Sequence, residues 1–367
     1  MRNPRGILLV ALCFLAGCGT ASKPVPAPDV VRNYNGTASV GDFLTISIDS
    51  TASTITYKNY TTGDSSTVPY TVKADGTYTI TDPSGNLLSA YEVPGFVMMV
   101  ETAKAGSKHD TAALLTAVES APASINTFAG RSFNYIQFRT AAGGTELGTV
   151  TIDGKGNVQH DGYWPFGVLT QPQDLFNGGS FAASSVQEDA SGDFFTITES
   201  SGSQDFVFGT QSGFFAVDTE NGAILGLPKA SSKSFDPSYA GTYTALFYEK
   251  SDALMGPNNR EDGTPSEGQA TVTISASGVV SIADSKSTLA SGKLVAVADT
   301  PYLYDGTQNM LSDPCYGLFT FRTSTANSQQ DFFVSFENGA VIFSSFQTVL
   351  PIQPYATYTY FYGVGLK

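Results

Sequence analysis

The chain has 367 residues and is acidic, with 33 aspartates and glutamates against 19 lysines and arginines and a net charge of −14. A surface of this charge repels phosphates, so the composition argues against nucleic acid as a partner. Because only 14% of the residues are charged and 41% are hydrophobic, the chain is not a disordered acidic tail, and its length suffices for two or three domains with buried cores.

The first 18 residues have the three parts of a secretory signal. Arg2 and Arg5 form a basic region, and residues 7–15 form an apolar stretch that is too short to span a bilayer. Residues 15–18 read LAGC, which resembles the lipobox of bacterial lipoproteins. The resemblance implies that the chain is cleaved before Cys18 and that its sulfur carries a lipid such as palmitate. The alternative is an ordinary cleaved signal that contains a cysteine.

Residues 18–33 are expected to form a flexible tether between the lipid and the folded body. Pro24, Pro26 and Pro28 stand at alternate positions, which favours an extended and unpacked chain. Gly19, rather than an aspartate, follows the cysteine, and resemblance to the sorting pattern of Gram-negative lipoproteins makes this favour the outer membrane. The sequence therefore predicts a cell-envelope protein held to the membrane by lipid, in the outer membrane if the organism is Gram-negative.

Internal repeats predict a fold built from similar β-units. The segments at 45–57, 149–160 and 271–282 each alternate threonine or serine with isoleucine or valine on both sides of a turn. That pattern is typical of a hairpin with one buried face. A second repeat relates ENGAILGL at 220–227 to ENGAVIFS at 337–344, in which Asn-Gly predicts a tight turn. We therefore expect an all-β protein of repeated antiparallel units, either sandwiches or barrel-like sheets.

The repeats place the predicted units at 34–127, 128–228 and 235–367. Strands of the first unit are expected at 43–49, 54–60, 67–73, 77–81, 86–92 and 96–101. One short helix near 110–120 is expected to connect the first two units, because an aspartate precedes an apolar stripe and a proline follows it. The polar segment 251–268 is rich in glycine and proline and is expected to be an exposed loop of the third unit.

Two groups of aromatic residues are candidate ligand-binding surfaces. The first group is Tyr163, Trp164 and Phe166, and the second is Tyr358, Tyr360 and Tyr362, which alternate along the last predicted strand. Exposed aromatic rings stack on sugars and anchor protein interfaces. The alternative for both groups is packing against a loop or within a core.

The sequence assigns no catalytic residue. His160 and Asp161 are adjacent, but neighbouring residues of a strand point to opposite faces, so they do not make an acid–base pair. Cys315, the only cysteine after Cys18, has no histidine near it in sequence and is expected to be a buried structural thiol. No cofactor is predicted apart from a weak calcium candidate, formed by Asn258, Glu261, Asp262 and Glu267, which does not match the EF-hand pattern.

These patterns favour a non-enzymatic binding or adhesion protein of the cell envelope, with a glycan, peptide or protein as its partner. One alternative is a structural or assembly component whose units pack edge to edge, which long unpaired strands would favour. Another is a polysaccharide hydrolase, which would need two carboxyl groups facing each other in a cleft.

Overall fold

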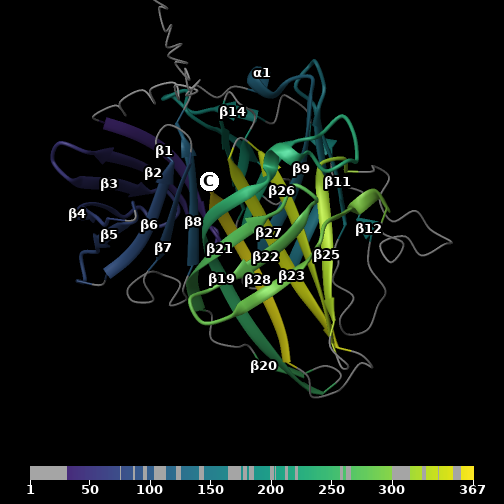
Figure 1. The fold of residues 1–367 in the computed structure, drawn as a ribbon. Coiled ribbons are helices and arrows are strands. Elements are labelled where there is room, and N and C mark those ends of the chain that lie inside the picture. The colour runs from purple at the N-terminus through teal and green to yellow at the C-terminus, as the bar shows by residue number, and fades with distance from the viewer. Residues whose placement is uncertain are drawn as a thin grey trace, which may run out of the picture.

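The computed structural model describes residues 31–367 with gaps. The gaps are residues 75, 86, 94–96, 103–112, 121–124, 140–143, 164–174, 177–179, 182–185, 199–201, 203, 211–213, 220–221, 257–258, 262–265, 300–314, 325–327, 338 and 350–356. The described chain is almost entirely β-strand and forms three antiparallel sheets, which we call units 1, 2 and 3 (Figure 1). The all-β class expected from the sequence is confirmed, and none of the described helices is long and apolar enough to cross a membrane.

Unit 1 is a closed eight-stranded barrel in which β8 returns to pair with β1. Its strands are β1 (Val31–Ala38), β2 (Phe43–Asp49), β3 (Thr54–Asn59), β4 (Ser65–Val72), β5 (Tyr78–Thr81), β6 (Leu87–Val93), β7 (Val97–Thr102) and β8 (Ala113–Glu119). Buried side chains such as Tyr34, Ile46 and Ala117 fill the interior. Because β1 begins at Val31, the end of the predicted tether belongs to the barrel wall.

Unit 2 is a ten-stranded sheet in which the first strand, β9, pairs with the last, β18. The short helix α1 (Ile125–Phe128) precedes it, and its strands are β9 (Arg131–Arg139), β10 (Gly144–Ile152), β11 (Val158–Tyr163), β12 (Leu175–Phe176), β13 (Ser180–Phe181), β14 (Val186–Glu188), β15 (Phe195–Thr198), β16 (Gln204–Gly209), β17 (Phe215–Thr219) and β18 (Gly222–Pro228). Phe128 of α1 is fully buried against Phe133, Phe195 and Phe215 in the interior of the unit.

Unit 3 is a second ten-stranded sheet, which pairs β19 with β28 and curls so that β23 contacts β25. It contains the 3-10 helices η2 (Pro237–Tyr239) and η3 (Val297–Asp299) and the strands β19 (Gly241–Gly256), β20 (Asn259–Glu261), β21 (Ser266–Ile274), β22 (Val279–Ala283), β23 (Thr288–Lys293), β24 (Val295–Ala296), β25 (Leu318–Ser324), β26 (Ser328–Glu337), β27 (Ala340–Val349) and β28 (Thr357–Leu366). Its interior is rich in phenylalanine, including Phe321, Phe332 and Phe343.

The repeated segments occupy related places in the three sheets. The hairpin repeats contribute β2, β10 and β21, each of which pairs with the first strand of its unit. The ENG repeats lead into β18 and β27. Here the units differ, since β18 ends unit 2 whereas β28 follows β27 in unit 3.

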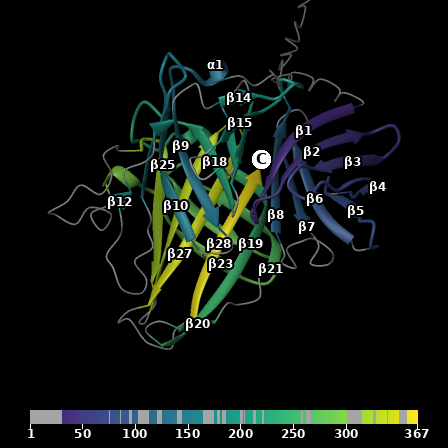
Figure 2. The same ribbon diagram turned by 180° about the vertical axis from the view of Figure 1, so that it is seen from behind.

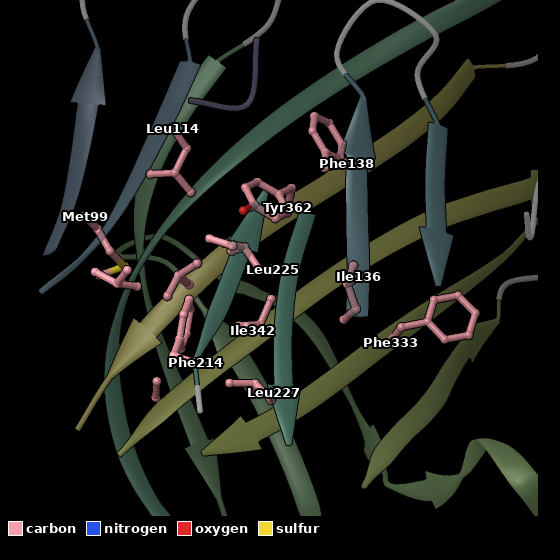
Figure 3. Packing of buried hydrophobic residues seen from close by; sticks show 14 of the residues in the cluster. Met99, Leu114, Ile136, Phe138, Phe214, Leu225, Leu227, Phe333, Ile342 and Tyr362 are labelled. Carbon is pink, nitrogen blue, oxygen red and sulfur yellow. The ribbon is translucent and has the colours of Figure 1, made fainter. Parts of the chain in front are cut away.

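The three units pack around one apolar cluster that all of them share. In Figure 1 the barrel of unit 1 stands at the left of units 2 and 3, and Figure 2 shows the same arrangement from behind. Unit 1 contacts both other units through β1 and β8, which lie against β16, β17 and β18 of unit 2 and against β19 and β21 of unit 3. Units 2 and 3 contact each other where β9, β10 and β18 lie against β26 and β27. Figure 3 shows members of the shared cluster, which come from unit 1 (Met99, Leu114), unit 2 (Ile136, Phe138, Phe214, Leu225, Leu227) and unit 3 (Phe333, Ile342, Tyr362).

The helix expected near 110–120 is wrong, because this segment forms strand β8. Leu115 and Ala117 belong to the barrel interior, whereas Leu114 and Val118 belong to the shared cluster. A strand buried on both faces lacks the alternation that identifies a half-buried strand, so its apolar run resembles a helical stripe. The connection between units 1 and 2 does contain a helix, but it is the four-residue α1.

The loop expected at 251–268 is also largely wrong. Strand β19 continues to Gly256 and pairs with β28 as far as Ala253, and β21 begins at Ser266. The backbone hydrogen bonds of these long strands do not depend on apolar side chains, so the polar composition concealed them.

Candidate binding surface

Most of the predicted site residues have no described side chain. Residues with no described position are Cys18, Trp164, Phe166, Asn258 and Asp262. Residues that lie in described strands but whose side chains are not described are Tyr163 in β11, Tyr358 and Tyr360 in β28, Glu261 in β20 and Glu267 in β21. The remaining described residues contain no group of three or more histidine, cysteine, aspartate or glutamate side chains that could hold a metal ion.

Tyr362 is completely buried, so its assignment to an exposed aromatic surface is wrong. Its ring stacks on Phe138 with the centroids 5.1 Å apart, and Phe138 in turn meets the edge of Tyr248. Burial raises the pKa of the Tyr362 hydroxyl, and the nearby Thr116 hydroxyl offsets part of this rise. At Tyr362, Val364 and Leu366 the outward face of β28 is covered by other units rather than by water, which alternation along one strand cannot reveal.

An aromatic cluster that the sequence analysis missed lies between units 1 and 2, and we call it the seam cluster. It consists of Phe43 and Tyr60 of unit 1 and Phe194, Phe206 and Phe208 of unit 2. Phe43 is fully buried and stacks on Phe206, with ring centroids 4.6 Å apart and an interplanar angle of 9°. Tyr60 remains 36% exposed and Phe206 is half-buried, so the cluster reaches the surface where the two units join.

The turn after β3 holds Tyr60 in place on this surface. The Asn59 side chain accepts hydrogen bonds from the backbone N–H groups of Thr61 and Thr62, and Gly63 supplies the positive φ of 82° that the turn requires. The Tyr60 N–H donates to the Phe43 carbonyl at 2.8 Å, which ties the turn to β2. Tyr60 therefore projects from a fixed backbone.

Charged side chains border the exposed part of the seam cluster. The Lys58 ammonium lies 4.0 Å from the centroid of the Tyr60 ring, within the range of a cation–π interaction. Asp189 of unit 2 accepts a hydrogen bond from the Ser191 N–H, which lowers the pKa of Asp189, and Lys58 adds a weaker electrostatic effect in the same direction. The surface thus combines an apolar centre with a charged edge, as protein interfaces do.

Polar side chains of β1 make the deeper contacts between the same two units. The Asn35 amide donates to the Asp193 carbonyl at 2.9 Å, and the Thr37 hydroxyl donates to Asp218 Oδ1 at 2.6 Å. Both β1 residues are buried, and Asp218 is only 3% exposed. Burial raises the pKa of Asp218 well above its ordinary value, and the acidic neighbours Asp42 and Asp205 raise it further, against the opposing effect of Thr37.

A second buried polar group lies inside the barrel of unit 1 and is enclosed by it. Arg32 donates through Nε and Nη2 to the two carboxylate oxygens of Glu92 at 2.7 and 2.8 Å. Tyr34 and Tyr78 also donate their hydroxyls to Glu92. The hydrogen bonds that Arg32 makes to Glu92 raise the pKa of Arg32, against the opposing effect of burial. Since each of these groups already has a partner inside the barrel, we regard this cluster as structural.

Weak sequence signals for the seam were present. A carboxylate stands in the apolar run FFAVDT, where Asp218 follows four apolar residues, and single rings stand at the ends of β2 and β3. No spacing rule links these positions, because they come from two units and meet only in the folded chain.

Comparisons with known proteins identify no relative from which a function could be transferred. No family model and no curated protein matches the chain. Among solved structures, a double mutant of transferrin binding protein B from Haemophilus parasuis Hp5 is 9% identical with a TM-score of 0.25, covering 93% of this chain and 76% of that one. A protein of unknown function from the DUF3598 family of Nostoc punctiforme is 8% identical with a TM-score of 0.16, covering 92% and 95%. Scores this low carry no argument about this protein.

Proposed function

We propose that this protein is lipid-anchored in the bacterial cell envelope and that it binds a glycan, peptide or protein partner through the exposed part of the seam cluster, without catalysing a reaction. The lipobox and the proline-rich tether supply the anchor. The three packed units supply a folded body that displays the surface beyond the membrane.

The observation that carries the binding proposal is the partly exposed ring of Tyr60. It rests on the fully buried ring of Phe43 and stands beside Phe194 with a centroid distance of 5.6 Å. Tyrosines held by rigid packing are frequent anchors of protein interfaces, because they contribute a large contact area and lose little conformational entropy on binding.

The described carboxyl groups support a hydrolase less well. Asp218 and Glu249 are two described carboxyl groups whose pKa is raised, in both cases chiefly by burial. They belong to β17 of unit 2 and β19 of unit 3, and Asp218 is sealed between units 1 and 2. A glycosidase needs two carboxyl groups on either side of one bond, so this placement favours binding over hydrolysis.

Labelling with a palmitate analogue in bacterial cells tests the anchor. We expect the label in the intact chain and in the membrane fraction, and its loss in Cys18→Ala. Cys315→Ala is the matched control, because it removes the buried cysteine of the folded body and keeps the lipobox. Equal labelling of the intact chain and Cys18→Ala contradicts the anchor.

Thermal-shift titrations with glycans, peptidoglycan fragments and candidate host or envelope proteins test the binding surface. A partner that binds only the folded state raises the melting temperature with concentration. We expect Tyr60→Ala to abolish the concentration-dependent shift, whereas Val279→Ala, which removes an exposed apolar side chain from unit 3, leaves it unchanged. A partner whose shift survives Tyr60→Ala binds elsewhere and contradicts the assignment of the surface.

A further inference from the structure

We propose that the contact between units 1 and 2 is a proton-dependent junction, in which protonated Asp218 holds unit 1 in place and loss of the proton loosens it. Loosening would separate the two halves of the seam cluster and so regulate the proposed binding surface. The biological role thus rests on the proposed function, but the junction can be measured without any partner, so failure of one proposal is distinguishable from failure of the other.

The geometry of Asp218 gives the first argument. The side chain lies on β17, is 3% exposed and faces β1, from which Thr37 donates a hydrogen bond of 2.6 Å. The charged groups of the described residues that act on this carboxyl are Asp42, which follows β1, and Asp205 of β16, and both are acidic. A buried carboxylate without a cation is costly, so such a group takes up a proton instead.

The direction of the pH dependence follows from the raised pKa of Asp218 in the docked state. When unit 1 undocks, water reaches the carboxyl and its pKa returns toward the ordinary value of about 4. The docked state therefore binds a proton that the undocked state releases. Docking is fully stabilised below the ordinary pKa and weakens as the pH rises through the raised one.

Comparison with the contact between units 1 and 3 indicates that the contact between units 1 and 2 is the one that responds to pH. Thr116 of β8 and Tyr362 of unit 3 bury their hydroxyls at the boundary between units 1 and 3, and neither oxygen makes a hydrogen bond of normal geometry among the described residues. Because the interaction of these two hydroxyls with each other falls short of a normal hydrogen bond, it offsets only part of the cost of burying them. By comparison, Asn134 at the boundary between units 2 and 3 donates to the Tyr316 carbonyl at 2.7 Å, while its own side-chain oxygen makes no hydrogen bond among the described residues.

Fluorescence energy transfer across the junction tests the proposal. The probe is the chain from residue 19 onward, labelled through Ala52→Cys in unit 1 and Ala190→Cys in unit 2, which are both exposed positions. Cys315 is 1% exposed and lies between units 2 and 3 beside Thr149, so it stays unlabelled while those units remain together. We expect efficient transfer at pH 5, a decline toward pH 9, and constant transfer in Asp218→Asn, which keeps the shape of the side chain and cannot ionise.

The controls make each outcome decisive. Asp284→Asn changes a partly exposed carboxyl that follows β22 in unit 3 and should follow the parent protein. Constant transfer in the parent protein overturns the proposal, as does an equal decline in the parent and in Asp218→Asn. If circular dichroism shows that Asp218→Asn does not fold, Thr37→Val replaces it. Because the Thr37 hydroxyl lowers the pKa of Asp218, its removal should move the midpoint of the decline to higher pH, and an unmoved midpoint overturns the junction.

Discussion

Glu92 shows how a single residue can hold the interior of a barrel together. It lies on β6, and it receives hydrogen bonds from Arg32 and Tyr34 of β1 and from Tyr78 of β5. Its side chain has no exposed surface, and that of Arg32 is 7% exposed. A buried ion pair offsets the cost of removing its charges from water only while both partners are present.

Glu92→Gln should therefore destabilise the protein strongly. The substitution keeps the size of the side chain but leaves the Arg32 guanidinium buried without a counter-charge, which typically costs about 3–5 kcal/mol. Urea denaturation followed by circular dichroism measures the change in the free energy of unfolding. The control is Lys233→Ala, which breaks the exposed pair of Lys233 with Asp299 and should change stability little. Equal effects of both variants would show that the buried pair contributes no more than a surface pair.

The same residue shows why the polar clusters could not be predicted from the sequence. Arg32 and Glu92 are 60 positions apart, and Thr37 and Asp218 are 181 positions apart. Neither pair belongs to a motif with a fixed spacing, so only the barrel closure and the packing of unit 1 on unit 2 bring them together. The prediction that Tyr362 belongs to an exposed aromatic surface failed for a similar reason, because another unit covers this residue in the folded chain.

At the level of strands, the sheets use glycine opposite phenylalanine to keep their interiors closely packed. Three cross-strand pairs follow this rule, namely Phe215 with Gly226, Phe247 with Gly268 and Phe343 with Gly363. In each pair the phenylalanine ring occupies the space where a side chain of the glycine position would lie. A Cβ atom at Gly363 would be 2.3 Å from Cζ of Phe343, which is far inside contact distance.

Gly363→Ala should consequently destabilise unit 3 through steric overlap. The ring of Phe343 must leave its place in the interior, and overpacking of this kind costs about 1–3 kcal/mol. Gly154→Ala is the matched control, because a Cβ atom at that turn position meets nothing within 4 Å. Thermal unfolding of the two variants and the parent measures the difference. A melting temperature for Gly363→Ala equal to that of Gly154→Ala would contradict close packing at this pair.

Strands with one buried face were the easiest elements to predict. The expected strands at 43–49 and 54–60 correspond to β2 and β3, where isoleucine alternates with threonine or serine. Prediction failed at β8, which is buried on both faces, and at the polar end of β19, whose pairing does not depend on its side chains. Alternation reports contact with water on one face, so it gives no signal where both faces share one environment.

At the level of the whole molecule, the shared cluster joins three units that each have an interior of their own. The first and last strands of each unit pair with each other, as β1 does with β8, β9 with β18 and β19 with β28. In each of these strand pairs at least one strand contacts another unit. Many of the other hairpins therefore lie away from the shared cluster. Stability of the assembly therefore depends on residues that face outward from their own sheets, among which Tyr362 is one of the largest.

Two substitutions at Tyr362 separate packing from hydrogen bonding in this centre. Tyr362→Phe keeps the ring that stacks on Phe138 and removes a buried hydroxyl that lacks a normal hydrogen bond, so stability should be unchanged or slightly increased. Tyr362→Ala removes the ring as well and should cost about 3–5 kcal/mol, because a cavity is left where the three units meet. Chemical denaturation gives both values, and reaction of Cys315 with a thiol reagent reports whether units 2 and 3 stay together. Strong destabilisation by Tyr362→Phe would show that the hydroxyl makes an essential contact, and equal stability of the alanine variant would show that the shared cluster does not hold the units together.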